Sequence, residues 1–366
     1  MDQELAEKTV EQLKGASIDF VTYLPETRLS RILPILEKDN FFTLVPVASE
    51  AEAVTIASGA ALVGKRPACY MEATGLFVCS YNLLAGEHPA GYSAPAPDIS
   101  RGKFCRSKKQ FPLRTHRSKN GRAAEGPQYR IPSFGQHQRS EHRHFRRRAH
   151  DARAQAAFCF TVHRRFYCMN RRACLEALLP LVTDHLVVAS VSGQWVWGQL
   201  SKHEGNLLLG SMGNALGVGM GMALGLPHRQ VIVIESDGSV LLSLFNLPTL
   251  GTLHPDNLKV FVFDNEAYSG SRISRPTATA AKTDLAAIAR DSGIERAVTV
   301  RDLDAFNREM SSALKGPGLG FVVAKIEETF EHRNAERSDV DLMENKYRFV
   351  RYVERTEGKP IFLGRG

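Results

Sequence analysis

Two stretches of the chain alternate between the hydrophobic patterns of helices and strands. The first stretch is residues 1–86, where amphipathic segments alternate with short apolar runs. The spacing predicts helices over residues 4–16, 28–39 and 49–64, with Ser49 as an N-cap, strands over residues 18–25 and 41–48, and a strand followed by a turn over residues 66–75. Strands that alternate with helices predict a parallel, doubly wound sheet.

The second stretch, residues 168–330, shows the same alternation and predicts a second α/β domain. Its expected strands cover residues 185–193, 231–238, 258–265, 297–300 and 320–328. Its expected helices cover residues 171–182, 212–226, 243–253, 284–293 and 303–315. Pro248 is expected to interrupt the third of these helices. Residues 331–366 are a charged C-terminal tail to which the pattern assigns no element.

The overall composition is that of a folded protein with two domains. The chain has 366 residues, of which 43% are hydrophobic, so each half can bury a core of normal size. No run of about 18 apolar residues occurs, so we expect no transmembrane helix. The polar, acidic start lacks the apolar core of a signal peptide, from which we expect a cytoplasmic location. The six cysteines have no CxxC spacing, and we expect unpaired thiols.

Residues 87–167 differ in composition from both flanking stretches. Within them, residues 101–150 hold 15 Lys and Arg against two acids, although the whole chain has a net charge of only +8. They contain no Val or Met, one Leu and one Ile, so they have little apolar surface to offset the entropy lost on ordering. Three interpretations are a frame-shifted stretch of an α/β protein, a disordered basic insert, and an arm that binds nucleic acid. The absence of periodicity favours the frame shift and makes nucleic-acid binding the weakest of the three.

Acidic and amide side chains follow two of the predicted buried strands. Asp237 ends the run VIVIESD, and Asp264 and Asn265 end the run LKVFVFDN. In open parallel sheets ligands bind at the carboxyl ends of the strands. Carboxylate and amide oxygens suit a hard cation such as Mg²⁺, and Ser239 with exposed turn amides would suit phosphates. On spacing alone, an alternative stays open in which Asp237 caps a helix and the other two residues form a turn.

The span from SDGS to FDN resembles the thiamine-diphosphate motif, which usually starts with GDG and ends with NN. Ser236 stands here for the first Gly and Asp264 for the first Asn. The Mg²⁺ ligands that this resemblance implies are Asp237, Asn265 and the backbone carbonyl of Ala267, and the diphosphate contacts are Gly238 and Ser239.

The upstream segment LLLGSMGNALG resembles the part of this family that faces the cofactor. The matching residues are Gly210, Ser211, Met212 and Gly213. The resemblance implies that Met212 is the apolar wedge that bends the cofactor into a V shape. A methionine that only fills the core is the alternative, and its place in GSMG makes that alternative the weaker one.

The family also needs one Glu on a pyrimidine-binding domain, ahead of Ala residues and a helix Gly. In SEAEAVTIASG the match is Glu50 with Gly59, whereas Glu52 lies two positions off. The resemblance implies that Glu50 is the catalytic residue and donates a proton to the aminopyrimidine ring of the cofactor. Standing alone, such a Glu would be read as a solvated helix residue. Gly75 in MEATGLF matches a further turn of the same domain.

The resemblance extends to the short, two-domain group of sulfopyruvate and phosphonopyruvate decarboxylases. It covers residues 1–85 and about 169–330 and implies two thiamine-diphosphate-binding domains, the first of them incomplete. Residues 1–86 would be part of the pyrimidine-binding domain, and residues 168–330 the diphosphate- and Mg²⁺-binding domain. Because these domains are often separate subunits in sulfopyruvate decarboxylase, the chain resembles a fusion. It departs from the family pattern at Glu72, Ala73 and Thr74, at Asn214, and in the SGSRISRPT segment after DNEAY.

The activity implied is non-oxidative decarboxylation of a 2-keto acid, with thiamine diphosphate as electron sink and Mg²⁺ as its metal. The expected substrate is 3-sulfopyruvate, converted to sulfoacetaldehyde. Phosphonopyruvate is the alternative substrate, and an inactive homologue that still binds cofactor is the alternative function. Arg28 and Arg272 are candidate partners of a sulfonate or phosphonate group, although each also fits a surface residue. Since the family's Glu and metal site come from different subunits, we expect a homo-oligomer, with neither a membrane nor a nucleic-acid partner.

Overall fold

The computed structural model describes residues 3–24, 32–71, 75–87, 169–268, 275–327 and 341–361. All of these belong to one compact unit of the chain, made of residues 1–99 and 167–366. The basic segment predicted over residues 87–167 lies, apart from its first residue, outside the described residues. Its three interpretations therefore stay predictions.

The first stretch folds around a parallel sheet of three strands. The strands β1 (Phe20–Tyr23), β2 (Thr43–Pro46) and β3 (Pro67–Tyr70) lie in the order β2-β1-β3. The helices are α1 (Gln3–Gly15), α2 (Leu33–Leu36), α3 (Glu50–Leu62), α4 (Gly75–Val78) and α5 (Ser80–Glu87). The predicted elements are confirmed, but α2 is much shorter than the helix expected over residues 28–39, of which 28–31 lie outside the described residues.

Helix α3 shows how this local sequence fixes its structure. Ser49 caps it as predicted, because its hydroxyl accepts a hydrogen bond from the amide of Ala51 at 3.3 Å. Nearly every residue of the helix is buried, in keeping with its Ala-rich sequence. A helix that is apolar on all sides has to pack against other elements around its whole circumference.

The second stretch forms a parallel sheet of six strands in the order β10-β11-β7-β6-β4-β5. The strands are β4 (Leu186–Ser190), β5 (Asn206–Leu209), β6 (Val231–Ser236), β7 (Leu258–Asp264), β10 (Ala297–Val300) and β11 (Gly320–Lys325), with β8 (Ala267–Tyr268) and β9 (Arg275–Pro276) as a separate antiparallel pair. The helices are α7 (Arg171–Leu178), α8 (Val191–Leu200), α9 (Ala215–Gly225), α10 (Asp237–Leu242), α11 (Asn246–Leu253), α12 (Leu285–Asp291), α13 (Leu303–Lys315) and α15 (Leu342–Glu357), with 3₁₀ turns at Leu179–Leu181 and Ala278–Ala280.

The structure corrects the sequence predictions for this stretch in several places. Strand β5 and helix α8 were not predicted, and the expected strand 185–193 ends at Ser190. Pro248 does not interrupt α11, because it lies in the first turn, where a backbone amide has no partner within the helix. Helix α15 lies inside the C-terminal tail. Its Asn345 side chain accepts from the Leu208 amide at 2.8 Å and donates to the Asn206 carbonyl at 2.9 Å, so it pairs with the edge strand β5.

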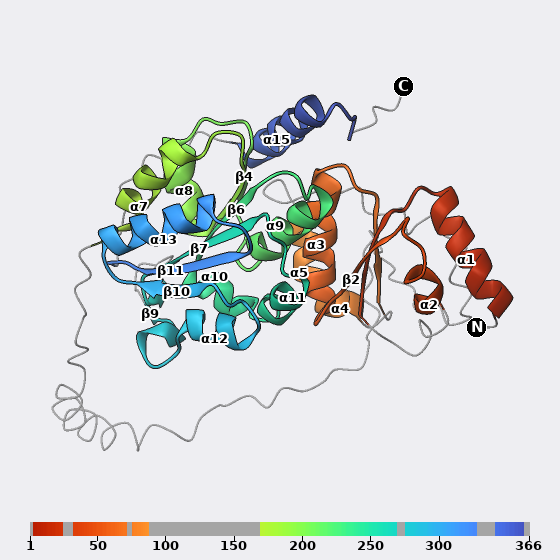
Figure 1. Ribbon diagram of the computed structural model, residues 1–366, viewed down its shortest axis with the longest axis horizontal. Helices are drawn as coiled ribbons and strands as arrows, with labels where there is room; N and C mark the ends of the chain where they lie inside the picture. The colour runs from red at the N-terminus through yellow and green to blue at the C-terminus, as the bar shows by residue number, and fades with distance from the viewer. Residues whose placement is uncertain are drawn as a thin grey trace, which may run out of the picture. The chain divides into compact units, whose positions relative to one another are not determined.

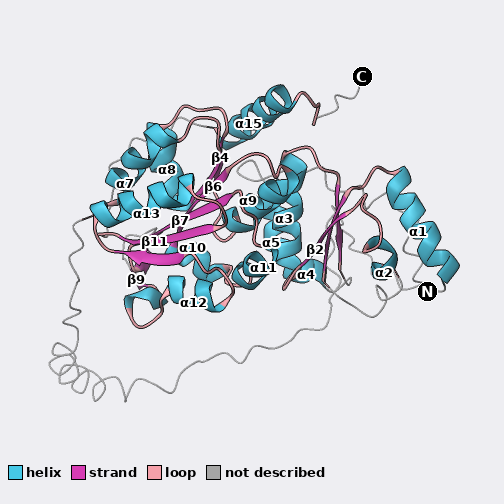
Figure 2. Cartoon of the chain, in the orientation of Figure 1, coloured by secondary structure: helices cyan, strands magenta, loops and turns pink. Residues whose placement is uncertain are grey.

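Helices cover both faces of the six-stranded sheet (Figure 2). Alternate strand residues enter different cores, since Val231 and Val233 pack with α9 while Ile232 and Ile234 pack with α8 and α13. This continuous apolar run is typical of a parallel strand that is buried on both sides. The predicted fold class, α/β with doubly wound parallel sheets, is confirmed.

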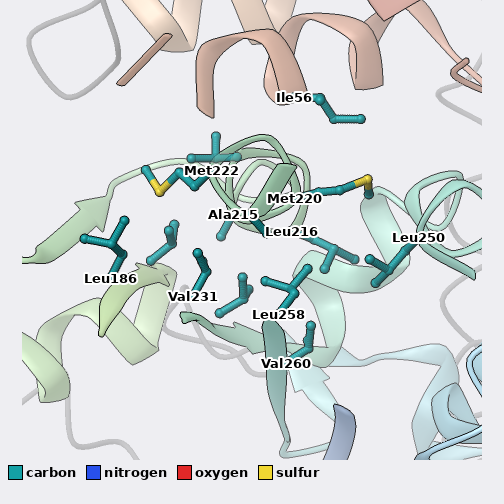
Figure 3. Close-up of a cluster of buried hydrophobic side chains, with 14 of the residues drawn as sticks. Ile56, Leu186, Ala215, Leu216, Met220, Met222, Val231, Leu250, Leu258 and Val260 are labelled. Atoms are coloured by element: carbon teal, nitrogen blue, oxygen red, sulfur yellow. The ribbon is translucent and has the colours of Figure 1, made fainter. Parts of the chain in front are cut away.

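Helices α3 and α9 pack side by side and join the two stretches (Figure 1). Their backbones approach so closely that an added Cβ on Gly59 would lie 2.0 Å from the carbonyl oxygen of Val218. An added Cβ on Gly221 would lie 1.9 Å from the carbonyl oxygen of Ile56. Figure 3 shows the α9 side chains between Ile56 on α3 and the strands of the larger sheet. The two stretches therefore share one hydrophobic core.

Within the described part of the chain, no helix is long and apolar enough to cross a membrane. The described cysteines Cys69, Cys79 and Cys174 are free thiols, as predicted. Burial raises the pKa of Cys69 to about 11 and that of Cys174 to about 12, so both stay protonated and unreactive.

Candidate cofactor site

The two predicted metal-binding motifs come together at the carboxyl edge of the larger sheet. Strands β6 and β7 are paired neighbours, with Ser236 opposite Phe263, so Asp237 and Asp264 follow at adjacent positions. Both carboxylates are almost fully buried. The parallel sheet thus collects onto one edge acids that lie far apart in the sequence, as the motif analysis expects.

Two threonines connect these acids. Thr277 donates a hydrogen bond to Asp237 Oδ2 at 2.6 Å. The hydroxyl of Thr279 lies 2.7 Å from Asp264 Oδ1 and 3.2 Å from Asp237 Oδ2. Burial, together with the nearby charge of Asp264, raises the pKa of Asp237 to about 6. A cation placed at this edge would relieve that repulsion.

Lys325, at the end of β11, neutralises part of this acidic cluster. Its Nζ lies 2.8 Å from Asp264 Oδ2 and 2.8 Å from Glu266 Oε1. Burial lowers the pKa of Lys325, but its contacts with the two carboxylates outweigh burial and raise that pKa overall. The sequence analysis did not single out Lys325. The available signal was a charged residue in a strand that is otherwise apolar.

The donor set at this edge fits Mg²⁺ better than a transition metal. Among the described residues, no group of three or more His, Cys, Asp and Glu side chains could hold a metal ion. The candidate ligands are instead one carboxylate, one amide and one carbonyl, from Asp237, Asn265 and Ala267. Hard oxygen donors of this kind suit Mg²⁺, which completes its octahedron with phosphate oxygens and water.

The glycine-rich segment GSMG lies against the same edge. Gly213 has a φ of +77°, a left-handed conformation that L side chains rarely adopt, and its amide donates to Ser239 Oγ at 2.7 Å. An added Cβ on Gly238 would lie 2.6 Å from the Tyr268 ring and 3.6 Å from Met212 Cε. The structure therefore brings together four of the predicted residues, Met212, Gly213, Gly238 and Ser239. Of the other two, Gly210 is exposed, and Ser211 accepts a hydrogen bond from Asn214.

The first stretch reaches this segment through helices α4 and α5. Asn82 Nδ2 donates to Asn214 Oδ1 at 2.7 Å, and the hydroxyl of Tyr81 lies 3.4 Å from the carbonyl oxygen of Met212. Glu50, in the first turn of α3, packs against Gly75 so closely that an added Cβ there would lie 2.5 Å from Glu50 Cγ. The predicted catalytic residue and the cofactor-facing segment are thus connected through the consecutive helices α4 and α5.

Glu52 occupies a different environment from Glu50. It is fully buried, and its Oε2 accepts hydrogen bonds from the Ala48 amide at 2.7 Å and from Thr249 at 3.0 Å. Burial raises the pKa of Glu52 to about 7. The hydrogen-bonded carboxyl of Glu52 therefore connects α3 to α11, and the choice of Glu50 as the catalytic residue stays a prediction.

One more buried acid, Glu235, lies near the carboxyl end of β6. Ser190 donates to Glu235 Oε2 at 2.5 Å at the ends of β4 and β6, and burial raises the pKa of Glu235. Its place two residues before Asp237 was the available signal in the sequence. Four predicted features, Arg28, Arg272, the Glu72–Ala73–Thr74 departure and most of the SGSRISRPT segment, lie outside the described residues.

A parallel sheet with acidic, amide and glycine-rich turns at its carboxyl edge is typical of α/β proteins that bind a phosphorylated ligand there. Comparison with known proteins agrees. Residues 194–324 match the family model "Thiamine pyrophosphate enzyme, C-terminal TPP binding domain". The sulfopyruvate decarboxylase subunit beta of Methanocaldococcus jannaschii is 37% identical over 150 residues, which cover 41% of this chain and 77% of that subunit.

Other relatives are also similar to parts of this chain. The subunit alpha of the same Methanocaldococcus jannaschii enzyme is 36% identical over 64 residues, which cover 18% of this chain and 38% of that subunit. Phosphonopyruvate decarboxylase of Streptomyces viridochromogenes is 32% identical over 152 residues, covering 41% of this chain and 38% of the relative. The crystal structure of benzoylformate decarboxylase from Polynucleobacter necessarius shares the fold, with a TM-score of 0.59, 12% identity, and coverage of 88% of this chain and 98% of that one.

The chain belongs to the family of thiamine pyrophosphate-dependent decarboxylases that includes sulfopyruvate decarboxylase. The resemblance stated from the sequence motifs is therefore confirmed.

Proposed function

We propose that the chain decarboxylates 3-sulfopyruvate to sulfoacetaldehyde, with thiamine diphosphate and Mg²⁺ as cofactors. The observation that carries the proposal is that Asp237 and Asp264, which precedes Asn265, lie side by side at one sheet edge, where Gly213 is hydrogen-bonded to Ser239. The sulfopyruvate decarboxylase relative supports the choice of substrate. Phosphonopyruvate is the second candidate, because the Streptomyces relative is named for it.

Each part of the site would hold a different part of the cofactor. Asp237, Asn265 and the carbonyl of Ala267 would bind Mg²⁺, while Gly210, Ser211, Gly238 and Ser239 would contact the diphosphate. Met212 would support the bend between the rings, and Gly75 would leave room beside Glu50. When bound, the thiazolium ring supplies the electron sink for decarboxylation. Glu50 would hold a proton at its carboxyl for the pyrimidine nitrogen.

The proposed division of functions within the chain, and its proposed oligomeric state, rest on similarity to two separate subunits. The Methanocaldococcus jannaschii relatives are named as separate subunits alpha and beta, and this chain is similar to parts of both. We place the pyrimidine-binding function in residues 1–86 and the diphosphate- and Mg²⁺-binding function in residues 168–330. We propose a homo-oligomer, a dimer or larger, located in the cytoplasm.

The experiment is a measurement of CO₂ release by the full chain with Mg²⁺ and thiamine diphosphate. Matched reactions would contain 3-sulfopyruvate, phosphonopyruvate or pyruvate. We expect the highest kcat/KM with 3-sulfopyruvate and no release without the cofactor. Cofactor binding without CO₂ release from any of the three acids would contradict the proposed activity and identify an inactive cofactor-binding homologue.

A further inference from the structure

Lys325 contacts three oxygen atoms on two segments that border the candidate metal site. Its Nζ lies 2.8 Å from Asp264 Oδ2, 2.8 Å from Glu266 Oε1 and 3.3 Å from the carbonyl oxygen of Thr279. The Lys325 side chain is only 8% exposed. A buried lysine that contacts the start and the middle of one turn restricts how that turn can move.

The turn itself has an unusual backbone. Glu266 has a φ of +59°, a left-handed conformation that a residue other than glycine rarely adopts. It lies between Asn265 and Ala267, the two candidate ligands of the turn. Two hydrogen bonds hold it there, from the Glu266 amide to Asp264 Oδ1 and from the Thr277 amide to the Glu266 carbonyl, both at 3.0 Å. Such strain persists only where the surroundings fix the conformation.

We propose that Lys325 is a positioning residue that fixes the strained turn Asp264–Ala267, so that Asn265 and the Ala267 carbonyl face the metal. The inference rests on the proposed function for the identity of the metal. It also accounts for Asp264, which stands where the family motif usually has Asn. Lys325 supplies the counter-charge for that extra acid and holds its Oδ2, while Thr279 and the Glu266 amide contact Oδ1.

The alternative is that Lys325 only stabilises the fold, and the chain provides a matched control for it. Lys259 is also a buried strand lysine, on the neighbouring strand β7. Its Nζ donates to the carbonyl oxygens of Asp256, Gly316 and Gly318, which lie before β7 and before β11, at the amino edge of the sheet. Lys259→Met therefore removes a comparable buried lysine far from the candidate ligands.

The test is a calorimetric titration of MgCl₂ into the full chain saturated with thiamine diphosphate. We expect Lys325→Met to weaken Mg²⁺ binding about 10- to 100-fold, as substitutions of residues that orient metal ligands do. Lys259→Met should lower the melting temperature but leave Mg²⁺ affinity within about 3-fold of wild type, well under that range. Lys325→Arg, which keeps the charge, should recover part of the lost affinity.

The results decide whether Lys325 positions the metal ligands or only stabilises the fold. Wild-type Mg²⁺ affinity in Lys325→Met, or an equal loss in Lys259→Met, would overturn the inference and leave the proposed function intact. If Lys325→Met does not fold, Glu266→Gln removes one of its two ionic partners, and unchanged Mg²⁺ affinity there would overturn the inference equally. If the wild-type chain binds neither Mg²⁺ nor thiamine diphosphate, the proposed function fails and this inference fails with it.

Discussion

At the scale of single residues, two glutamates two positions apart on α3 have opposite environments. Glu50 is half-buried in the first turn and packs against Gly75, whereas Glu52 is fully buried and hydrogen-bonded to Thr249. Side chains two positions apart on a helix point in different directions. The Glu52 carboxyl therefore joins α3 to α11, whereas the Glu50 carboxyl is the one proposed for catalysis.

Glu50→Gln is expected to lower kcat at least about 100-fold, the lower end of the usual contribution of a general acid. The amide has nearly the same shape but cannot donate the carboxyl proton, so thiamine diphosphate should still bind with an affinity close to that of wild type. CO₂ release and a binding titration on the same sample measure the two quantities. Full activity in this variant would refute the role assigned to Glu50.

Glu52 predicts a pH dependence of stability. Because its pKa rises from 4.5 to about 7 on folding, the folded state holds a proton that the unfolded state releases. The contribution is fully present below about pH 4.5 and is lost as the pH rises through about 7, in total about 3 kcal/mol. Urea unfolding at about pH 5 and about pH 8 should show this loss in wild type and a smaller one in Glu52→Gln. Equal losses in both proteins would contradict it.

At the scale of elements, the α3–α9 crossing holds the two stretches together. We expect Gly221→Ala to destabilise the chain by about 3 kcal/mol, because the added Cβ would collide with the Ile56 carbonyl. Gly15→Ala is the control, since an added Cβ at the end of α1 meets nothing within 4 Å. That change should be neutral or slightly stabilising, given the helix propensity of alanine. Thermal unfolding compares them, and equal melting temperatures would contradict the close packing.

The hydrophobic pattern predicted most elements because buried parallel strands and amphipathic helices leave strong local signals. Strand β5 was missed, since its run of three leucines is short and leads directly into GSMG. Pro248 was misjudged because proline is tolerated in a first turn and breaks a helix only further in. Contacts between distant segments determine the elements that the pattern missed. An example is the contact of Asn345 on α15 with strand β5.

At the scale of the whole molecule, one chain carries elements similar to both subunits of a two-subunit relative. Their contacts, from Asn82 to Asn214 and from Glu52 to Thr249, connect the predicted catalytic helix to the predicted cofactor edge. The sequence motifs name candidate residues on both sides, and their roles stay predictions. They could not predict Lys325, Thr277 or Thr249, because these are brought to the site only by the folding of distant segments.

The most direct test of the account is the binding of thiamine diphosphate to the full chain. Calorimetry should show saturable, Mg²⁺-dependent binding, and ligand at about 100 times its Kd should stabilise the chain by about 2.7 kcal/mol. Asp237→Ala should remove both effects. Absence of binding heat and of any rise in melting temperature, at millimolar cofactor and Mg²⁺, would contradict the cofactor site and the function proposed from it.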